Sequence, residues 1–155
     1  MKKNRLYLDS SVISHLEAPD TPEKMQETLL LWNDIKNGKY DIVISSVLIE
    51  EIDKCHQPKR NKMYEFLGDI EYERIATDDG IKNIADEIIR LGILTEKSRY
   101  DCLHIACALV SSCNYIVSWN FKHLVNIKTV NGVRAITNIF GFNNIDIIAP
   151  PSLLF

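Results

Sequence analysis

Several features that mark special classes of protein are scarce in this sequence. It has six glycines and five prolines in 155 residues, and neither is concentrated in a linker or a low-complexity segment. No run of about 18 apolar residues occurs, so no segment is expected to span a membrane. These absences argue against fibrous, disordered and membrane proteins. The length fits a single domain, residues 1–155.

Signals for secretion and for disulfide bonding are also missing. The apolar stretch after Arg5 is interrupted at Asp9, which makes it too short for the core of a signal peptide. The four cysteines form no CxxC pair, and three of them fall in one apolar, helix-like segment. We therefore expect buried, reduced thiols in a cytoplasmic protein, with no disulfide and no zinc site.

Positive charge is not in excess. The 18 Lys and Arg residues stand against 21 Asp and Glu residues, which gives a formal net charge of -3 at pH 7. Binding to nucleic-acid phosphates normally depends on Lys and Arg, so any such surface has to be local. The candidates are the basic segment 54–62, Lys97, Arg99, Lys122 and His123. A solvated surface without a ligand explains the same residues.

Short apolar strands alternate with amphipathic helices along the chain. The runs with the length and β-branched content of strands are residues 5–8, 41–46, 72–75, 115–118 and 145–148. The helical patterns begin near Val12 and continue at residues 21–38, 47–55, 58–68, 78–92, 98–113 and 131–140. This alternation predicts an α/β fold, a three-layer α/β/α sandwich with a mostly parallel central sheet of four to five strands.

Carboxylate and amide side chains follow several of these strands. The residues in question are Asp9, the pair Glu50 and Glu51, Asp101 and Asn120. Ligands of an open parallel sheet gather at the carboxyl ends of its strands, so these side chains can converge there. Clustered carboxylates repel one another, and a hard cation such as Mg²⁺ relieves that repulsion. A metal held in this way can activate water for attack on a phosphoryl group.

Four segments resemble those of PIN domains. They are residues 7–13 (YLDSSVI), 45–52 (SSVLIEEI), 101–108 (DCLHIACA) and 116–124 (IVSWNFKHL), and they occur in the order that this family has. The resemblance implies a PIN-like fold and a Mg²⁺- or Mn²⁺-dependent endoribonuclease that hydrolyses RNA phosphodiesters. Ser11 resembles the small hydroxyl residue that supports the first aspartate of the family.

By the same resemblance, Asp9, Glu51 and Asp101 are the acidic metal ligands, with Glu50 as the alternative to Glu51. Asn120 stands where many PIN domains carry an aspartate. It can offer a carbonyl oxygen to a metal-bound water but adds no charge, so a second metal would bind weakly. The likeness to bacterial PIN toxins further implies an antitoxin partner and a homodimer.

Each of these residues also has a structural interpretation. Asp9 can simply cap the first helix, and Asp101, three residues after Ser98, fits a capping box. His104 lies on the same helical face as Asp101, but we expect it to be a hydrogen-bonded structural residue. Trp119 is expected to pack in the interior and not to stack on a base.

Two other functions compete with the nuclease. A PIN-like module that binds nucleic acid or protein with little or no catalysis would agree with Asn120 and with the negative net charge. A phosphoryl-acceptor receiver or an aspartyl phosphatase uses a similar sheet. It requires paired acids around Asp9, and the sequence lacks them, so we rank it last.

Overall fold

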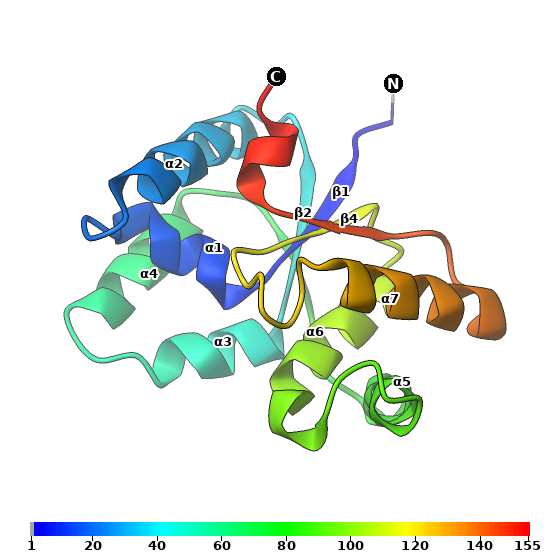
Figure 1. Ribbon diagram of the computed structural model, residues 1–155. Coiled ribbons are helices and arrows are strands. Elements are labelled where there is room, and N and C mark those ends of the chain that lie inside the picture. Colours follow the sequence, from blue (N-terminus) through cyan, green and yellow to red (C-terminus); the bar gives the residue numbers. More distant parts are fainter. Residues whose placement is uncertain (1) are drawn as a thin grey trace.

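A computed structural model describes residues 2–155 and has one sheet of five parallel strands between two layers of helices (Figure 1). The strands are β1 (Arg5–Leu8), β2 (Asp41–Ser45), β3 (Glu73–Ile75), β4 (Tyr115–Val117) and β5 (Asp146–Ile148). Their order in the sheet is β3-β2-β1-β4-β5, and every neighbouring pair is parallel. The predicted three-layer α/β/α sandwich is confirmed.

The helices divide between the two faces of the sheet. On one side lie α1 (Ser10–Ser14), α2 (Pro22–Lys36) and α4 (Lys59–Gly68), with α3 (Ser46–Asp53) at the lower edge in Figure 1. On the other side lie α5 (Asp79–Arg90), α6 (Arg99–Val110) and α7 (Ile127–Phe140). Short 3-10 turns occupy His15–Glu17, Glu96–Ser98 and Pro150–Leu153. No helix within residues 2–155 is long and apolar enough to cross a membrane.

The central strand β1 contributes to two apolar clusters. Leu6 and Leu8 belong to the cluster beneath α1, α2 and α4, whereas Tyr7 belongs to the cluster beneath α5, α6 and α7. Side chains alternate along a strand, so a strand covered on both faces is apolar at every position. This explains why residues 6–8 are all fully buried.

Two helix ends differ from the sequence expectation. Helix α7 begins at Ile127 and not near residue 131, because the Asn126 side chain caps it by accepting the Thr129 N–H at 2.9 Å. Helix α6 ends at Val110 and not near residue 113, and Ser112 beyond it adopts a left-handed φ of 54°. The turn at Pro150–Leu153 was not expected from the sequence.

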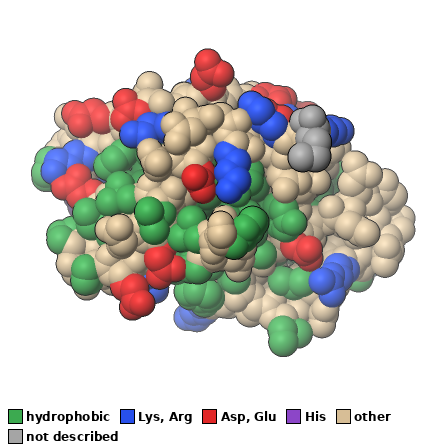
Figure 2. All heavy atoms as spheres, turned by 90° about the horizontal axis from the view of Figure 1, so that it is seen from above, with side chains coloured by type: hydrophobic (Ala, Val, Ile, Leu, Met, Phe, Trp, Pro, Cys, Tyr) green, Lys and Arg blue, Asp and Glu red, His purple; other side chains and the backbone are tan. Residues whose placement is uncertain are grey.

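The described part of the chain begins and ends at the upper edge of the sheet in Figure 1, where the strands begin. Figure 2 shows this face: Lys and Arg side chains are interspersed with Asp and Glu, and apolar side chains gather among them. A face with mixed charges has no extended positive field to attract nucleic acid.

Candidate active site

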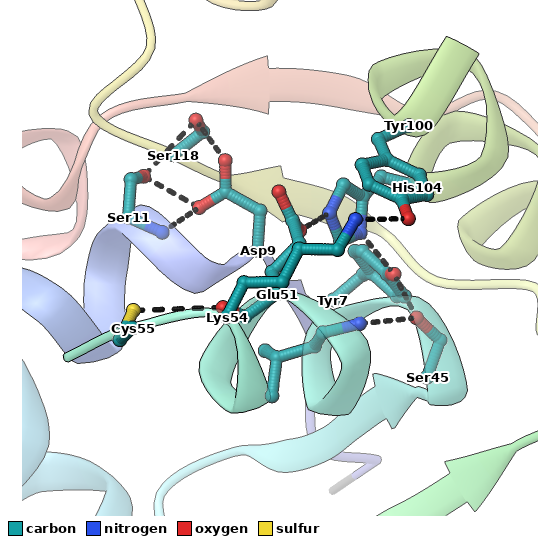
Figure 3. Close-up of polar contacts among 11 residues, drawn as sticks. Tyr7, Asp9, Ser11, Ser45, Glu51, Lys54, Cys55, Tyr100, His104 and Ser118 are labelled. Carbon is teal, nitrogen blue, oxygen red and sulfur yellow. Dashed lines mark hydrogen bonds and ion pairs between the residues drawn. The ribbon is translucent and has the colours of Figure 1, made fainter. Parts of the chain in front are cut away.

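Asp9, the first residue of the candidate site, directly follows β1. It is the N-cap of α1, and its Oδ1 accepts the Ser11 N–H at 3.1 Å and the Ser11 hydroxyl at 2.5 Å. Its Oδ2 accepts the Ser118 hydroxyl at 2.5 Å (Figure 3). The capping interpretation is therefore correct, and Ser11 supports Asp9 as expected. The capping bond to the Ser11 N–H uses only one lone pair of the Asp9 carboxylate, so Asp9 can cap α1 and still bind a cation.

Ser118, which follows β4, ties the loop beyond it to Asp9. Its side chain is fully buried, and its Oγ also accepts the Asn120 N–H at 2.9 Å. The Trp119 N–H donates to Ser11 Oγ at 2.9 Å. These bonds hold both oxygens of Asp9 in place from two neighbouring strands. Ser118 was not predicted as a site residue, although a hydroxyl at the end of a buried strand needs a hydrogen-bond partner.

The environment of Asp9 disfavours its charge. Burial raises the pKa of Asp9 above its ordinary value, and the nearby Glu51 carboxylate raises it further. The His104 ring and the hydroxyl donors Ser11 and Ser118 lower the pKa but offset only part of this effect. A positive charge close to Asp9 would therefore be stabilised.

Of the two adjacent glutamates on α3, Glu51 belongs to the site. Its Oε1 is hydrogen-bonded to Nε2 of His104, whereas Glu50 is exposed. Successive helix positions point about 100° apart, so only one of the two can face inward. The geometry favours Glu51, the residue chosen from the sequence.

His104 lies on α6 and is buried, with 1% of its surface exposed. Nδ1 of His104 lies 2.5 Å from the Tyr7 hydroxyl, which lies 2.6 Å from Ser45 Oγ. Burial lowers the pKa of His104, but the hydrogen bond and charge of Glu51, with the charges of Asp9 and Asp101, outweigh it and raise the pKa. His104 is a hydrogen-bonded residue, as expected.

Tyr7 and Ser45 were not predicted as residues of the site. Tyr7 could have been recognised, because it lies in a strand that is apolar on both faces and a buried Tyr hydroxyl usually has a hydrogen-bond partner.

Asp101 lies in the first turn of α6 and is partly buried. Burial raises its pKa, the rings of His104 and His123 lower it, and the carboxylates of Asp9 and Glu51 raise it. The capping box considered for Asp101 is not formed, because the Ser98 side chain makes no capping bond. That structural alternative was wrong.

A hollow of about 480 Å³ opens beside these groups. We call it the site hollow, and its lining residues are Glu51, Lys97, Ser98, Arg99, Tyr100, Asp101 and Asn120. Three of the four predicted site residues line it. The fourth, Asp9, is joined to it through Ser118, which bonds both to Asp9 and to the Asn120 N–H. Oδ1 of Asn120 already accepts the His123 N–H at 3.0 Å.

Several cations of the predicted basic surface are used within the fold. Lys59 donates to backbone carbonyls in the first turns of the chain, and Lys62 pairs with Glu17. Arg99 pairs with two carboxylates, Asp86 and Glu96. Lys54 lies at the site instead, with its Nζ 2.5 Å from the Tyr100 hydroxyl and 4.3 Å from the centre of that ring. Lys97 lines the site hollow, and Lys54 contacts Tyr100, another residue of its lining.

Trp119 packs in the interior, as expected. Only 7% of its surface is exposed, and its indole N–H donates to Thr28 Oγ1 at 2.9 Å. Its ring lies 5.6 Å from that of His15 and 6.2 Å from that of Phe121, measured between centroids. This packing anchors the loop that carries Asn120 to α2.

The donor atoms suit a hard divalent cation. Mg²⁺ and Mn²⁺ prefer oxygen ligands, and the buried carboxylates of Asp9 and Asp101 have raised pKa values that a cation would lower. Within residues 2–155, no three His, Cys, Asp or Glu side chains converge closely enough to enclose an ion. Bound Mg²⁺ usually keeps several water ligands, so such a site needs few protein ligands.

Two of three comparisons with known proteins found nothing: no family model and no curated protein matches the chain. Among solved structures, the chain is similar to a chain of VapBC2 from Rickettsia felis, whose crystal structure holds a DNA fragment from the VapBC2 promoter. The TM-score is 0.55 at 15% sequence identity, and the match covers 94% of this chain and 98% of that chain. Because nearly the whole of both chains is matched, the two share an overall fold, which agrees with the PIN-like fold expected from the sequence.

Proposed function

We propose that this protein is a Mg²⁺- or Mn²⁺-dependent endoribonuclease that hydrolyses RNA phosphodiesters, with Asp9, Glu51, Asp101 and Asn120 as its site. The observation that carries the proposal is the arrangement of three carboxylates from different elements at the carboxyl edge of the sheet. Two of them are partly or fully buried, with pKa values raised by burial. Carboxylates in this state favour a bound cation.

A divalent cation held here would supply an activated water and would offset charge developing on the phosphoryl group. The residues of the chain would orient the reactants. Ser11 and Ser118 hold the two oxygens of Asp9, and His104 holds Glu51. The Nδ2 amide of Asn120 can donate to a phosphate oxygen. Lys54 and Lys97 would attract the RNA backbone to the site hollow.

We further propose that the protein acts in the cytoplasm as the toxin of a toxin–antitoxin pair, with a small antitoxin as its partner and a second copy in a homodimer. The resemblance to PIN toxins and the fold shared with VapBC2 support this role. The single domain expected over residues 1–155 would then carry the whole nuclease site.

A PIN-like binding module with weak or absent catalysis is the second candidate. It is favoured by the uncharged Asn120, whose carbonyl oxygen already accepts a backbone N–H, and by the net charge of -3. A binding module would use the site hollow for recognition and would not cleave RNA.

The experiment that separates the two candidates is cleavage of a labelled, mixed-sequence RNA with Mn²⁺, with Mg²⁺ and with EDTA. Wild type is compared with Asp9→Asn, Glu51→Gln and Asp101→Asn, and Glu50→Gln is the matched control because this neighbouring carboxylate is exposed. We expect metal-dependent cleavage that is lost in the first three variants and kept in Glu50→Gln. Absence of cleavage by folded, partner-free protein would favour the binding module.

A further inference from the structure

We infer that Tyr7 and His104 are positioning residues, which fix the direction of the Glu51 carboxylate through one buried chain of hydrogen bonds. The consequence for metal binding depends on the proposed function, whereas the chain of hydrogen bonds does not. Neither residue is assigned a contact with substrate or metal.

The imidazole of His104 is held at both nitrogens. Nε2 bonds to Oε1 of Glu51, and Nδ1 lies 2.5 Å from the Tyr7 hydroxyl. The ring is buried, so turning it would break both bonds and leave polar groups unpaired where water cannot replace the lost partners. The orientation of the ring therefore fixes the orientation of the carboxylate that it contacts.

Tyr7 is fixed in turn by the sheet. It is fully buried in β1, and its ring meets that of His104 edge-on, at 5.6 Å between centroids and an interplanar angle of 63°. Its hydroxyl lies 2.6 Å from Oγ of Ser45, which ends β2. Ser45 also caps α3, since its Oγ accepts the Leu48 N–H at 3.4 Å.

These contacts form a closed ring. Helix α3 begins at the Ser45 cap, carries Glu51, and is tied through His104 and Tyr7 back to Ser45. The start of α3 is thus held by Ser45 of β2, and the Glu51 carboxylate is held, through His104, by Tyr7 of β1. Loss of the Tyr7 hydroxyl alone would interrupt this closed series of contacts, although that hydroxyl does not touch Glu51.

The directions of the hydrogen bonds are consistent around this chain. A carboxylate only accepts, so Nε2 of His104 carries the proton that faces Glu51. Oε1 of Glu51 is then engaged, and Oε2 is the oxygen left for a cation. Hydrogen-bond partners of ligating carboxylates commonly change metal affinity by about 10- to 100-fold.

The test measures the binding of Mn²⁺ at fixed pH, with electron paramagnetic resonance used to detect the free ion. We expect Tyr7→Phe to weaken binding by about tenfold or more. The control is Tyr40→Phe, which removes the hydroxyl of another buried tyrosine in the opposite apolar cluster and should bind as wild type does. Urea unfolding confirms that each variant is folded.

A double-variant cycle separates positioning from a general structural role. If Tyr7 acts through Glu51, then Tyr7→Phe has no further effect once Glu51→Gln is present. Equal losses in both backgrounds would overturn the inference. His104→Gln, which keeps an N–H donor for Glu51, should retain more affinity than His104→Leu.

If the wild type binds no Mn²⁺, the proposed nuclease is refuted but the positioning role of Tyr7 and His104 is not. That role can still be tested by a spectroscopic measurement on metal-free protein. The Nε2 proton of His104 should resonate far downfield in a proton–nitrogen spectrum. The resonance should be lost in Glu51→Gln and shifted in Tyr7→Phe. If Tyr7→Phe leaves the resonance in place, Tyr7 does not position the pair.

Discussion

At the scale of the residue, Asp9 links stability to pH. Burial raises its pKa, so the folded protein binds this proton more tightly than the unfolded chain does. Between the ordinary pKa of an aspartate and the raised pKa, the folded state therefore holds more protons. Stability from this group is greatest at low pH, falls as pH rises through that window, and is constant above it.

We expect Asp9→Asn to remove this contribution. The amide has no proton to lose, its Oδ1 can accept from Ser11, and its Nδ2 can donate to Ser118 Oγ. In metal-free buffer at pH 7 the variant should be at least as stable as the wild type, because it avoids burying the charge of Asp9. Urea unfolding between pH 3.5 and 7.5 measures this. A variant that loses stability at pH 7 would contradict it.

The cysteines allow a second prediction at this scale. Burial raises the pKa of Cys102 and of Cys113 to about 12 and that of Cys107 to about 11, whereas Cys55 is partly exposed. Because the thiolate is the reactive form, iodoacetamide at pH 8 should label Cys55 alone in the native protein. Mass spectrometry after labelling provides the readout, and the urea-denatured chain, labelled at all four positions, is the control. Native labelling of Cys107 would show that the core opens.

Side-chain chemistry at the site was only partly predictable from the sequence. The positions of Asp9, Asp101 and Asn120 could be inferred because the carboxyl ends of parallel strands share one edge. The contacts of Glu51 with His104 and of Ser118 with Asp9 join residues 53 and 109 positions apart. Such contacts depend on how helices and strands pack, which no local pattern specifies.

At the scale of the element, local signals located most helices and strands. Strand β1 was predicted at residues 5–8 and is observed there, and Asp78 caps α5 as expected. The start of α7 was misplaced because its capping residue, Asn126, lies ahead of the apolar pattern used to find the helix. The strand order could not be inferred, since it depends on which strands pair across the whole chain.

Helix packing predicts opposite effects for two glycine substitutions. A Cβ added to Gly132 in α7 would lie 2.6 Å from Cγ2 and 2.7 Å from Cγ1 of Ile93, whereas one added to Gly68 in α4 meets nothing within 4 Å. Gly132→Ala should therefore destabilise the protein by about 1–3 kcal/mol. Gly68→Ala should stabilise it by about 0.5–1 kcal/mol, because alanine is the better helix former. Urea unfolding of the pair tests both, and a stabilised Gly132→Ala would mean that α7 packs less closely.

At the scale of the whole molecule, the distribution of charge limits how the proposed RNA substrate can bind. The face in Figure 2 mixes both signs, and several cations of the predicted basic surface pair within the fold. Three lysines are candidates for contact with RNA: Lys97 lines the site hollow, Lys54 contacts Tyr100 in its lining, and Lys122 follows Asn120 by two residues. Single-stranded RNA held by three phosphate contacts should bind with a log–log salt slope of about -2.

Fluorescence anisotropy of labelled RNA with the Asp101→Asn variant, which should not cleave, measures that slope. Lys97→Ala should reduce its magnitude by about 0.7, whereas Lys82→Ala, on the exposed face of α5, should leave it unchanged. A slope of about -5 or steeper would show that a larger basic surface takes part.

The position of β1 between β2 and β4 has a consequence for synthesis of the chain on the ribosome. Glu51 comes from the part of the chain that builds one flank of the sheet, Asp101 and Asn120 come from the part that builds the other, and Asp9 lies at the strand where the two meet. A nascent chain that has emerged only as far as β3 has two of these four side chains. The complete constellation appears only after β4 has docked, so a nuclease of the proposed kind would be inactive on the ribosome until late in translation.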